Sequence, residues 1–218
     1  MKKPRICAVI VDNAPEAINE IEPLIDLFEA RIDFIGDGWQ ELVKRLEKPW
    51  IACNRSSGEG GKWHGSEARR IERLLQAIEL GADMVDIEIS TENLGNIVKL
   101  IKRRTKCLIS SHNLERTPPL DEMKETVRRQ LKIGADICKI VTTANKFEDN
   151  LTALQLISEF PGVSLISFTM GALGAISRVL CPLVGGDFTY ASIEQGKESA
   201  QGQITVRELS KIYEMIRE

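Results

Sequence analysis

The sequence has no long hydrophobic run. Its longest unbroken apolar stretch, Ile6–Val11, has six residues, whereas a membrane-spanning helix needs about 20. The chain also opens without the basic segment and apolar run of a secretory leader. We therefore expect a cytoplasmic protein with no membrane partner.

The sequence also has few histidines, no closely spaced pair of cysteines and no excess of positive charge. The net charge is −3, which gives no basic field for a nucleic-acid partner. The five cysteines include no C-x-x-C pair, and the only histidines are His64 and His112. These counts argue against a disulfide framework and leave a transition-metal site short of ligands.

Short apolar runs alternate along the chain with amphipathic stretches of helical spacing. Such alternation indicates a parallel sheet whose strands are joined by helices. The predicted strands are Arg5–Val11, Leu27–Arg31, Trp50–Asn54, Met84–Ile89, Cys107–His112, Ile137–Val141, Val163–Met170 and Phe188–Ser192. Amphipathic spacing predicts helices around Ile71–Ile78, Leu120–Leu131 and Leu209–Ile216, the last with a capping box from Thr205 to Glu208.

Eight strand runs in 218 residues leave about 27 residues for each unit, close to a minimal strand–helix repeat. The repeated motif Leu80–Asp83 and Ile133–Asp136 precedes two of the strands. No linker divides the chain. We predict one α/β domain over residues 1–218, a (β/α)8 barrel of parallel strands. An open doubly wound sheet is the alternative, but no G-x-G-x-x-G motif follows the first strand.

Charged residues interrupt these strands, where a barrel core would be apolar. In period-two alternation Glu29, Arg31 and Asp33 share one face, as do Asp86 and Glu88. Active sites of such barrels lie at the carboxyl ends of the strands, so these charges indicate a single site. Each charge alone fits a structural ion pair equally well.

Lys139 is the most informative of these residues, because it stands alone between apolar neighbours. Burial lowers the pKa of a lysine unless a carboxylate pairs with it, and a neutral amine can attack a ketone. The residues leave two roles open for Lys139, a Schiff-base nucleophile or a partner of Asp86 or Glu88. His112 is likewise either a general base or a structural histidine, and Arg178 suits a carboxylate as well as a phosphate.

Seven motifs in this order resemble those of the type I 3-dehydroquinase family. They are Glu29–Asp33, Arg55–Gly61, Asp86–Glu88, Ser110–His112, Lys139–Ile140, Met170–Arg178 and Ser199–Gln203. The resemblance implies a (β/α)8 barrel that acts as a homodimer without metal or cofactor. It also implies dehydration of 3-dehydroquinate to 3-dehydroshikimate by syn elimination of water.

The resemblance assigns a role to each site residue. Lys139 would form an imine with the C3 ketone, His112 would move the proton from C2 and protonate the departing C1 hydroxyl, and Glu59 would orient His112. The implied substrate-binding residues are Glu29, Arg31, Arg55, Arg178, Ser199 and Gln203, the last two on a lid. Two departures stand out: Asn113-Leu114 replaces Asp-Phe, and Gln201 replaces a lid proline, which we expect to loosen the lid.

Two other functions fit parts of the pattern. A class I aldolase acting on a sugar phosphate would share the barrel and the lysine, but Glu29 and Glu59 suit a hydroxylated acid better than a phosphate. A sensor that only binds a small acid would need no nucleophile beside a base. Dehydration is therefore the leading hypothesis.

Overall fold

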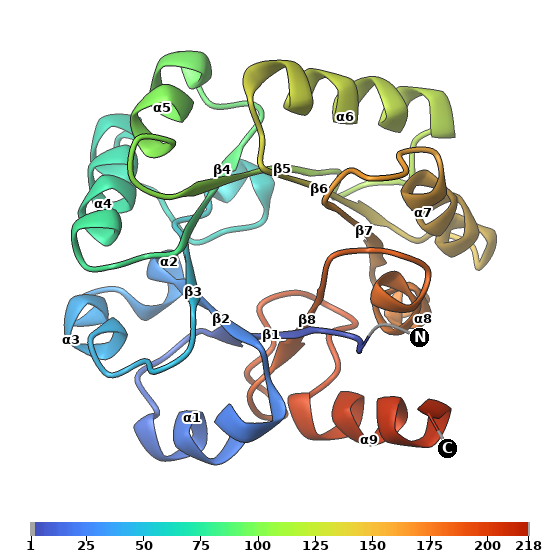
Figure 1. Cartoon of the computed structure of the whole chain (residues 1–218), viewed down its shortest axis with the longest axis horizontal. Coiled ribbons are helices and arrows are strands. Elements are labelled where there is room, and N and C mark those ends of the chain that lie inside the picture. Colours follow the sequence, from blue (N-terminus) through green and yellow to red (C-terminus); the bar gives the residue numbers. More distant parts are fainter. Residues whose placement is uncertain (1–2, 218) are drawn as a thin grey trace.

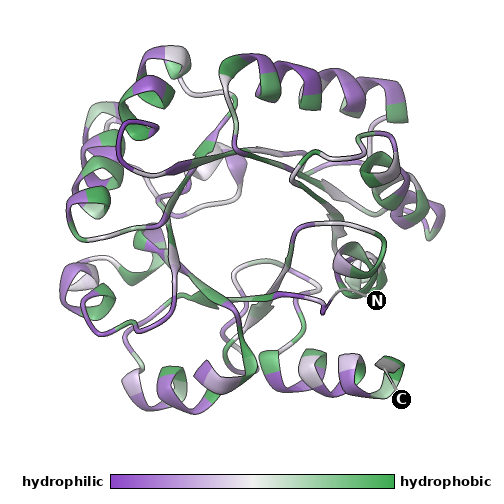
Figure 2. Cartoon of the chain, in the orientation of Figure 1, coloured by the Kyte–Doolittle hydropathy of each residue, from purple (hydrophilic) through white to green (hydrophobic). Residues whose placement is uncertain are grey.

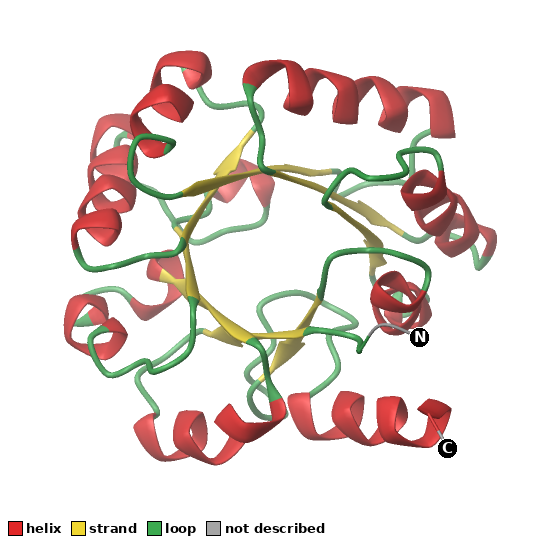
Figure 3. Ribbon diagram, viewed as in Figure 1, coloured by secondary structure: helices red, strands yellow, loops and turns green. Residues whose placement is uncertain are grey.

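Eight parallel strands form a ring in the computed structural model, which describes residues 3–217 (Figures 1 and 3). The hydrogen-bonded order is β7-β6-β5-β4-β3-β2-β1-β8, so each strand lies beside its neighbour in sequence. The strands are β1 Ile6–Ile10, β2 Leu27–Arg31, β3 Trp50–Cys53, β4 Met84–Glu88, β5 Lys106–His112, β6 Ile137–Thr143, β7 Leu165–Met170 and β8 Thr189–Ser192. The predicted (β/α)8 barrel is confirmed, with strand ends shifted by at most two residues.

Helices surround the ring and cover the outer face of the strands (Figure 1). Their apolar sides face the barrel and their polar sides face outward (Figure 2). The α-helices are α1 Pro15–Ile21, α2 Ile32–Ile35, α3 Trp39–Val43, α4 Glu67–Glu79, α5 Leu94–Ile101, α6 Leu120–Ile133, α7 Glu148–Ser158, α8 Ala175–Leu180 and α9 Val206–Arg217. Short 3₁₀ helices are η1 Glu22–Leu24, η2 Ser57–Glu59 and η3 Cys181–Leu183. Within residues 3–217 no helix is both long and apolar enough to cross a bilayer.

The ends of the helices follow from local chemistry. Gly134 closes α6 with a φ of 110°, a left-handed conformation that glycine adopts without steric cost. The predicted capping box opens α9, because Thr205 Oγ1 accepts from the Glu208 amide while Glu208 accepts from the Thr205 amide at 3.0 Å. One local prediction is wrong: β2 ends at Arg31, so Asp33 lies on α2 rather than on the strand face.

The ring closes between β7 and β8, where the described residues form no continuous ladder. Asp187 bridges this seam: its amide donates to Leu165 O at 3.0 Å, and its carboxylate accepts from Arg5 at 2.8 Å and Ser164 at 2.7 Å. Hydrogen bonds from a single aspartate thus replace part of a strand ladder.

We predict that Asp187→Ala lowers the free energy of unfolding by about 1–2 kcal/mol, because two side-chain donors lose their partner. Urea denaturation followed by circular dichroism measures the change. The control is Asp37→Ala, which removes a solvent-exposed carboxylate and should alter stability by less than about 0.5 kcal/mol. Equal stability of the two variants would show that Asp187 does not secure the seam.

Candidate active site

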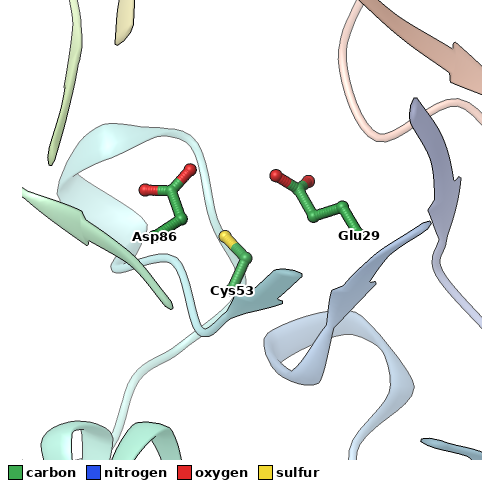
Figure 4. A group of neighbouring side chains, drawn as sticks. All are labelled: Glu29, Cys53 and Asp86. Atoms are coloured by element: carbon green, nitrogen blue, oxygen red, sulfur yellow. The ribbon is translucent and has the colours of Figure 1, made fainter. Parts of the chain in front are cut away.

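Polar side chains replace the apolar core halfway up the barrel. Because side chains alternate along a strand, Glu29, Cys53 and Asp86 of three neighbouring strands all turn inward (Figure 4). One carboxylate oxygen of Glu29, one of Asp86 and the sulfur of Cys53 lie within 4.8 Å of one another. Two buried carboxylates this close require positive charge beside them.

Lys139 on β6 provides that charge. Its Nζ donates to Asp86 at 2.9 Å and to Glu29 at 3.4 Å, and it lies 4.0 Å from the centre of the Tyr190 ring. Burial alone would lower the pKa of Lys139, but Asp86 and Glu29 outweigh burial and raise the pKa above its ordinary value. Lys139 therefore rests as an ammonium ion, and of the two carboxylate partners expected for it Asp86 is correct. Glu88 instead pairs with Arg70 and Arg55.

Asp86, which pairs with Lys139, also pairs with a second cation, Arg55. It accepts from Arg55 Nη2 at 2.7 Å and from Ser110 Oγ at 2.6 Å, while Arg55 Nη1 also donates to Ser110. Although burial would raise the pKa of Asp86, Arg55 and Lys139 lower it well below its usual range. The buried charges are thus mutually neutralised through fixed hydrogen bonds.

The loop after β3 carries Glu59 and depends on its glycines. A Cβ on Gly61 would lie 2.0 Å from the Arg55 carbonyl oxygen, and Gly60 has a φ of 80°. The Ser56 amide donates to Glu88 at 3.0 Å and anchors the loop to β4. These contacts hold the loop, and Glu59 with it, against the carboxyl ends of β3 and β4.

Glu59 contacts His112 twice. Glu59 Oε2 lies 3.0 Å from His112 Nδ1 and accepts from the His112 amide at 3.2 Å. Burial, followed by the positive charges of Arg55 and Lys139, lowers the pKa of His112 well below its ordinary value, although the negative charge of Asp86 acts in the opposite direction. His112 is therefore neutral at neutral pH. With its Nδ1–H donated to Glu59, the lone pair on Nε2 is free to accept a proton.

Two arginines line the same cavity but differ in their hydrogen-bonding partners. Arg31 is engaged by Asp33, with Nε and Nη2 donating at 2.9 and 2.7 Å. Arg178 on α8 stacks 4.5 Å from the centre of the Phe168 ring, and its buried Nε and Nη2 have no partner among residues 3–217. Burial lowers the pKa of Arg178 to about 10. An unsatisfied guanidinium of this kind is suited to a carboxylate ligand.

The segment between β8 and α9 covers one side of the cavity. Gln203 Oε1 accepts from the Ser199 amide at 2.8 Å and from its hydroxyl at 3.3 Å. The Gly171 amide donates to the Gln201 carbonyl at 3.2 Å, and a Cβ on Gly202 would lie 2.3 Å from Gly171 O. This backbone contact holds the segment against the loop after β7. It uses a carbonyl that a proline would also offer, so the loosening expected from Gln201 stays a prediction.

One cavity at the carboxyl end of the barrel contains every residue to which the resemblance gives a role. Its lining includes Glu29, Arg31, Arg55, Glu59, His112, Lys139, Arg178, Ser199 and Gln203. Sequence reasoning counted Asp86 among the charges that converge on one site but gave neither it nor Ser110 a role in the reaction, and it did not name Tyr190, although each contacts Lys139 or its partners. Period-two alternation with His112 could have marked Ser110 as facing the site, but no spacing pattern marks Tyr190.

The fold and this cavity define a (β/α)8-barrel enzyme whose cavity combines a buried lysine with a histidine held by a carboxylate. The family model of type I 3-dehydroquinase matches residues 6–218. A 3-dehydroquinate dehydratase of Dehalococcoides mccartyi is 42% identical, with 99% of this chain and 97% of the relative covered. One from Methanococcus maripaludis is 38% identical over 97% and 99% of the two chains.

Solved structures agree with the sequence relatives. The crystal structure of 3-dehydroquinate dehydratase from Geobacillus kaustophilus superposes with a TM-score of 0.84 at 28% identity, covering 99% of this chain and 92% of that one. The chain belongs to the type I 3-dehydroquinase family.

We predict that His112 keeps a neutral ring, protonated at Nδ1, at about pH 6, where an unperturbed histidine is mostly charged. The reason is its buried position beside Arg55 and Lys139, which disfavours a further positive charge. Nitrogen-15 NMR of histidine-labelled protein measures the state directly, and His64→Asn assigns the two rings. A charged His112 ring at neutral pH would contradict this electrostatic description.

Proposed function

We propose that this enzyme dehydrates 3-dehydroquinate to 3-dehydroshikimate through an imine on Lys139. The supporting observation is that Lys139 and the neutral His112 line one cavity with the unpartnered Arg178. An amine nucleophile, a base and a carboxylate-binding cation are the groups that the reaction requires. The named relatives favour this reaction over the aldolase and sensor alternatives.

Imine formation comes first in the proposed mechanism. The Lys139 ammonium passes one proton to the C3 carbonyl oxygen of the substrate as its nitrogen adds to C3, and a second proton from the same nitrogen follows when that oxygen leaves. Loss of the carbonyl oxygen as water then leaves a protonated imine. Asp86 and Glu29, which hold the resting ammonium, continue to balance the positive nitrogen. The iminium accepts electrons better than the ketone, so the covalent step lowers the barrier to proton removal from C2.

His112 then acts as base and acid. Nε2 takes the C2 proton, which gives an enamine and an imidazolium ion. The imidazolium returns a proton to the C1 hydroxyl as it leaves as water, on the same face for a syn elimination. Glu59 stabilises the imidazolium and keeps Nε2 directed at the substrate. Water finally hydrolyses the conjugated imine, releasing the enone product and the Lys139 amine.

The remaining cavity residues bind the substrate in this proposal. Arg178 pairs with the carboxylate through its free Nε and Nη2, because a planar guanidinium fits a carboxylate at two points. Glu29, Arg31 and Arg55 contact the ring hydroxyls, and Ser199 and Gln203 cover the bound ring. Closure of this segment excludes water, which protects the imine until elimination is complete.

We also propose that residues 1–218 act as a single catalytic domain in a cytoplasmic homodimer. Support for the dimer comes from large apolar side chains exposed on and near α7 and α8. Phe147, Leu151 and Leu173 are 57%, 59% and 46% exposed. Association with a second copy would remove this apolar surface from water.

Lys139→Ala is expected to abolish the covalent adduct and to lower kcat by a factor of about 10⁴ or more, because no other group in the cavity can form the imine. The measurement combines turnover, from the ultraviolet absorbance of the enone, with mass spectrometry after mixing with 3-dehydroquinate and sodium borohydride. The native protein should gain the mass of the reduced ligand on Lys139.

Two further variants make this test specific. Lys146→Ala removes an exposed lysine just after β6 and should behave as the native protein. His112→Ala should still form the adduct, with kcat lowered by about 10²- to 10⁴-fold from loss of the acid–base group. Full turnover by Lys139→Ala would refute the imine mechanism, and absence of enone from the native protein would refute the proposed reaction.

A further inference from the structure

Ser90 makes a contact with the catalytic pair that the proposed mechanism does not use. It lies two residues after the end of β4, and its hydroxyl donates to Glu59 Oε1 at 2.6 Å. The other carboxylate oxygen, Oε2, accepts from Nδ1 and the amide of His112. The two oxygens of Glu59 are thus divided between Ser90 and His112.

This division restrains the carboxylate. A glutamate held through one oxygen can still rotate about its terminal bond, because that torsion is broad. A hydrogen bond on the second oxygen removes the rotation and keeps Oε2 on the imidazole. Hydrogen bonds to a charged acceptor are also stronger than those between neutral groups. Ser90 is therefore placed to determine the orientation of Glu59.

The turn that carries Ser90 is itself rigid. The Thr91 amide donates to the Glu88 carbonyl at 3.1 Å, which closes the turn around Ser90. Arg70 of α4 binds both ends of it, through the Glu88 carboxylate and through Thr91 Oγ1 at 2.9 Å. Glu88 also accepts a hydrogen bond from the Ser56 amide. The ion pair of Arg70 and Glu88 therefore positions both the turn that carries Ser90 and the loop that carries Glu59.

Several charges act on the same carboxylate. Burial raises the pKa of Glu59, the hydrogen bond from Ser90 and the charge of Arg55 on β3 lower it, and Glu88 on β4 raises it. From β5 the His112 amide also lowers the pKa of Glu59. Removal of the Ser90 hydroxyl would leave burial and Glu88 less opposed, so Glu59 would take up a proton at a higher pH.

We propose that Ser90 is a positioning residue, which acts through Glu59 to hold His112 in the orientation and tautomer needed for proton transfer. This inference rests on the proposed function for its effect on turnover. The contact of Ser90 with Glu59, and of Glu59 with His112, exists independently of the substrate.

The test compares Ser90→Ala with Ser90→Thr, which retains the hydroxyl at an exposed position where an added methyl group meets solvent. Ser57→Ala is the matched control, since Ser57 is an exposed serine on the loop of Glu59. The pH dependence of kcat/KM and nitrogen-15 NMR of His112 are measured for each variant. Circular dichroism checks that each variant is folded.

Ser90→Ala should lower kcat by about two- to tenfold at neutral pH and shift the acidic limb of the profile upward by about half to one pH unit. Its His112 spectrum should lose the single Nδ1–H tautomer. Ser90→Thr should show the native pH profile and the native His112 spectrum, and Ser57→Ala should match the native protein in both measurements.

A Ser90→Ala profile and spectrum that superpose on those of the native protein would overturn the inference. A uniform loss of activity at every pH, with an unchanged His112 spectrum, would overturn it as well. If the native protein forms no enone, the proposed function fails, and the His112 spectra of the three variants alone decide whether Ser90 orients the pair.

Discussion

The site depends on one constraint, the burial of a lysine ammonium in the centre of a barrel. Lys139 is 5% exposed, and an ammonium ion removed from water is stable only beside opposite charge. Asp86 and Glu29 provide that charge, and Arg55 balances Asp86 in turn. The polar layer of the barrel is therefore a linked set, in which removal of one member leaves another charge uncompensated.

The same layer gives Lys139 and His112 opposite protonation states at rest. Carboxylates raise the pKa of Lys139, whereas burial and neighbouring cations lower the pKa of His112. Groups whose environments separate their pKa values in this way can divide acid and base roles between them. In the proposed mechanism a proton must therefore leave Lys139 before the imine forms, and the neutral ring of His112 is already present in the cavity.

Much of this arrangement follows from local sequence patterns, and the rest follows from long-range contacts. The eight strands were predictable because short apolar runs alternate with amphipathic stretches along the whole chain, and the motifs around Glu59, His112 and Lys139 marked the site. The choice of Asp86 over Glu88 as the partner of Lys139 depends on strand register, which a single sequence does not reveal. The role of Ser90 was not predicted either, because no motif or spacing in the sequence distinguishes a single serine after a strand.

The most direct test of this account is to measure whether Lys139 is charged in the protein without substrate. Nitrogen-15 NMR of lysine-labelled protein follows Nζ as the pH is raised, and Lys139→Arg assigns its signal. The account predicts an ammonium signal through neutrality and a pKa above the ordinary 10.5. Titration of Nζ near about pH 7, as for a buried lysine without a carboxylate partner, would contradict it.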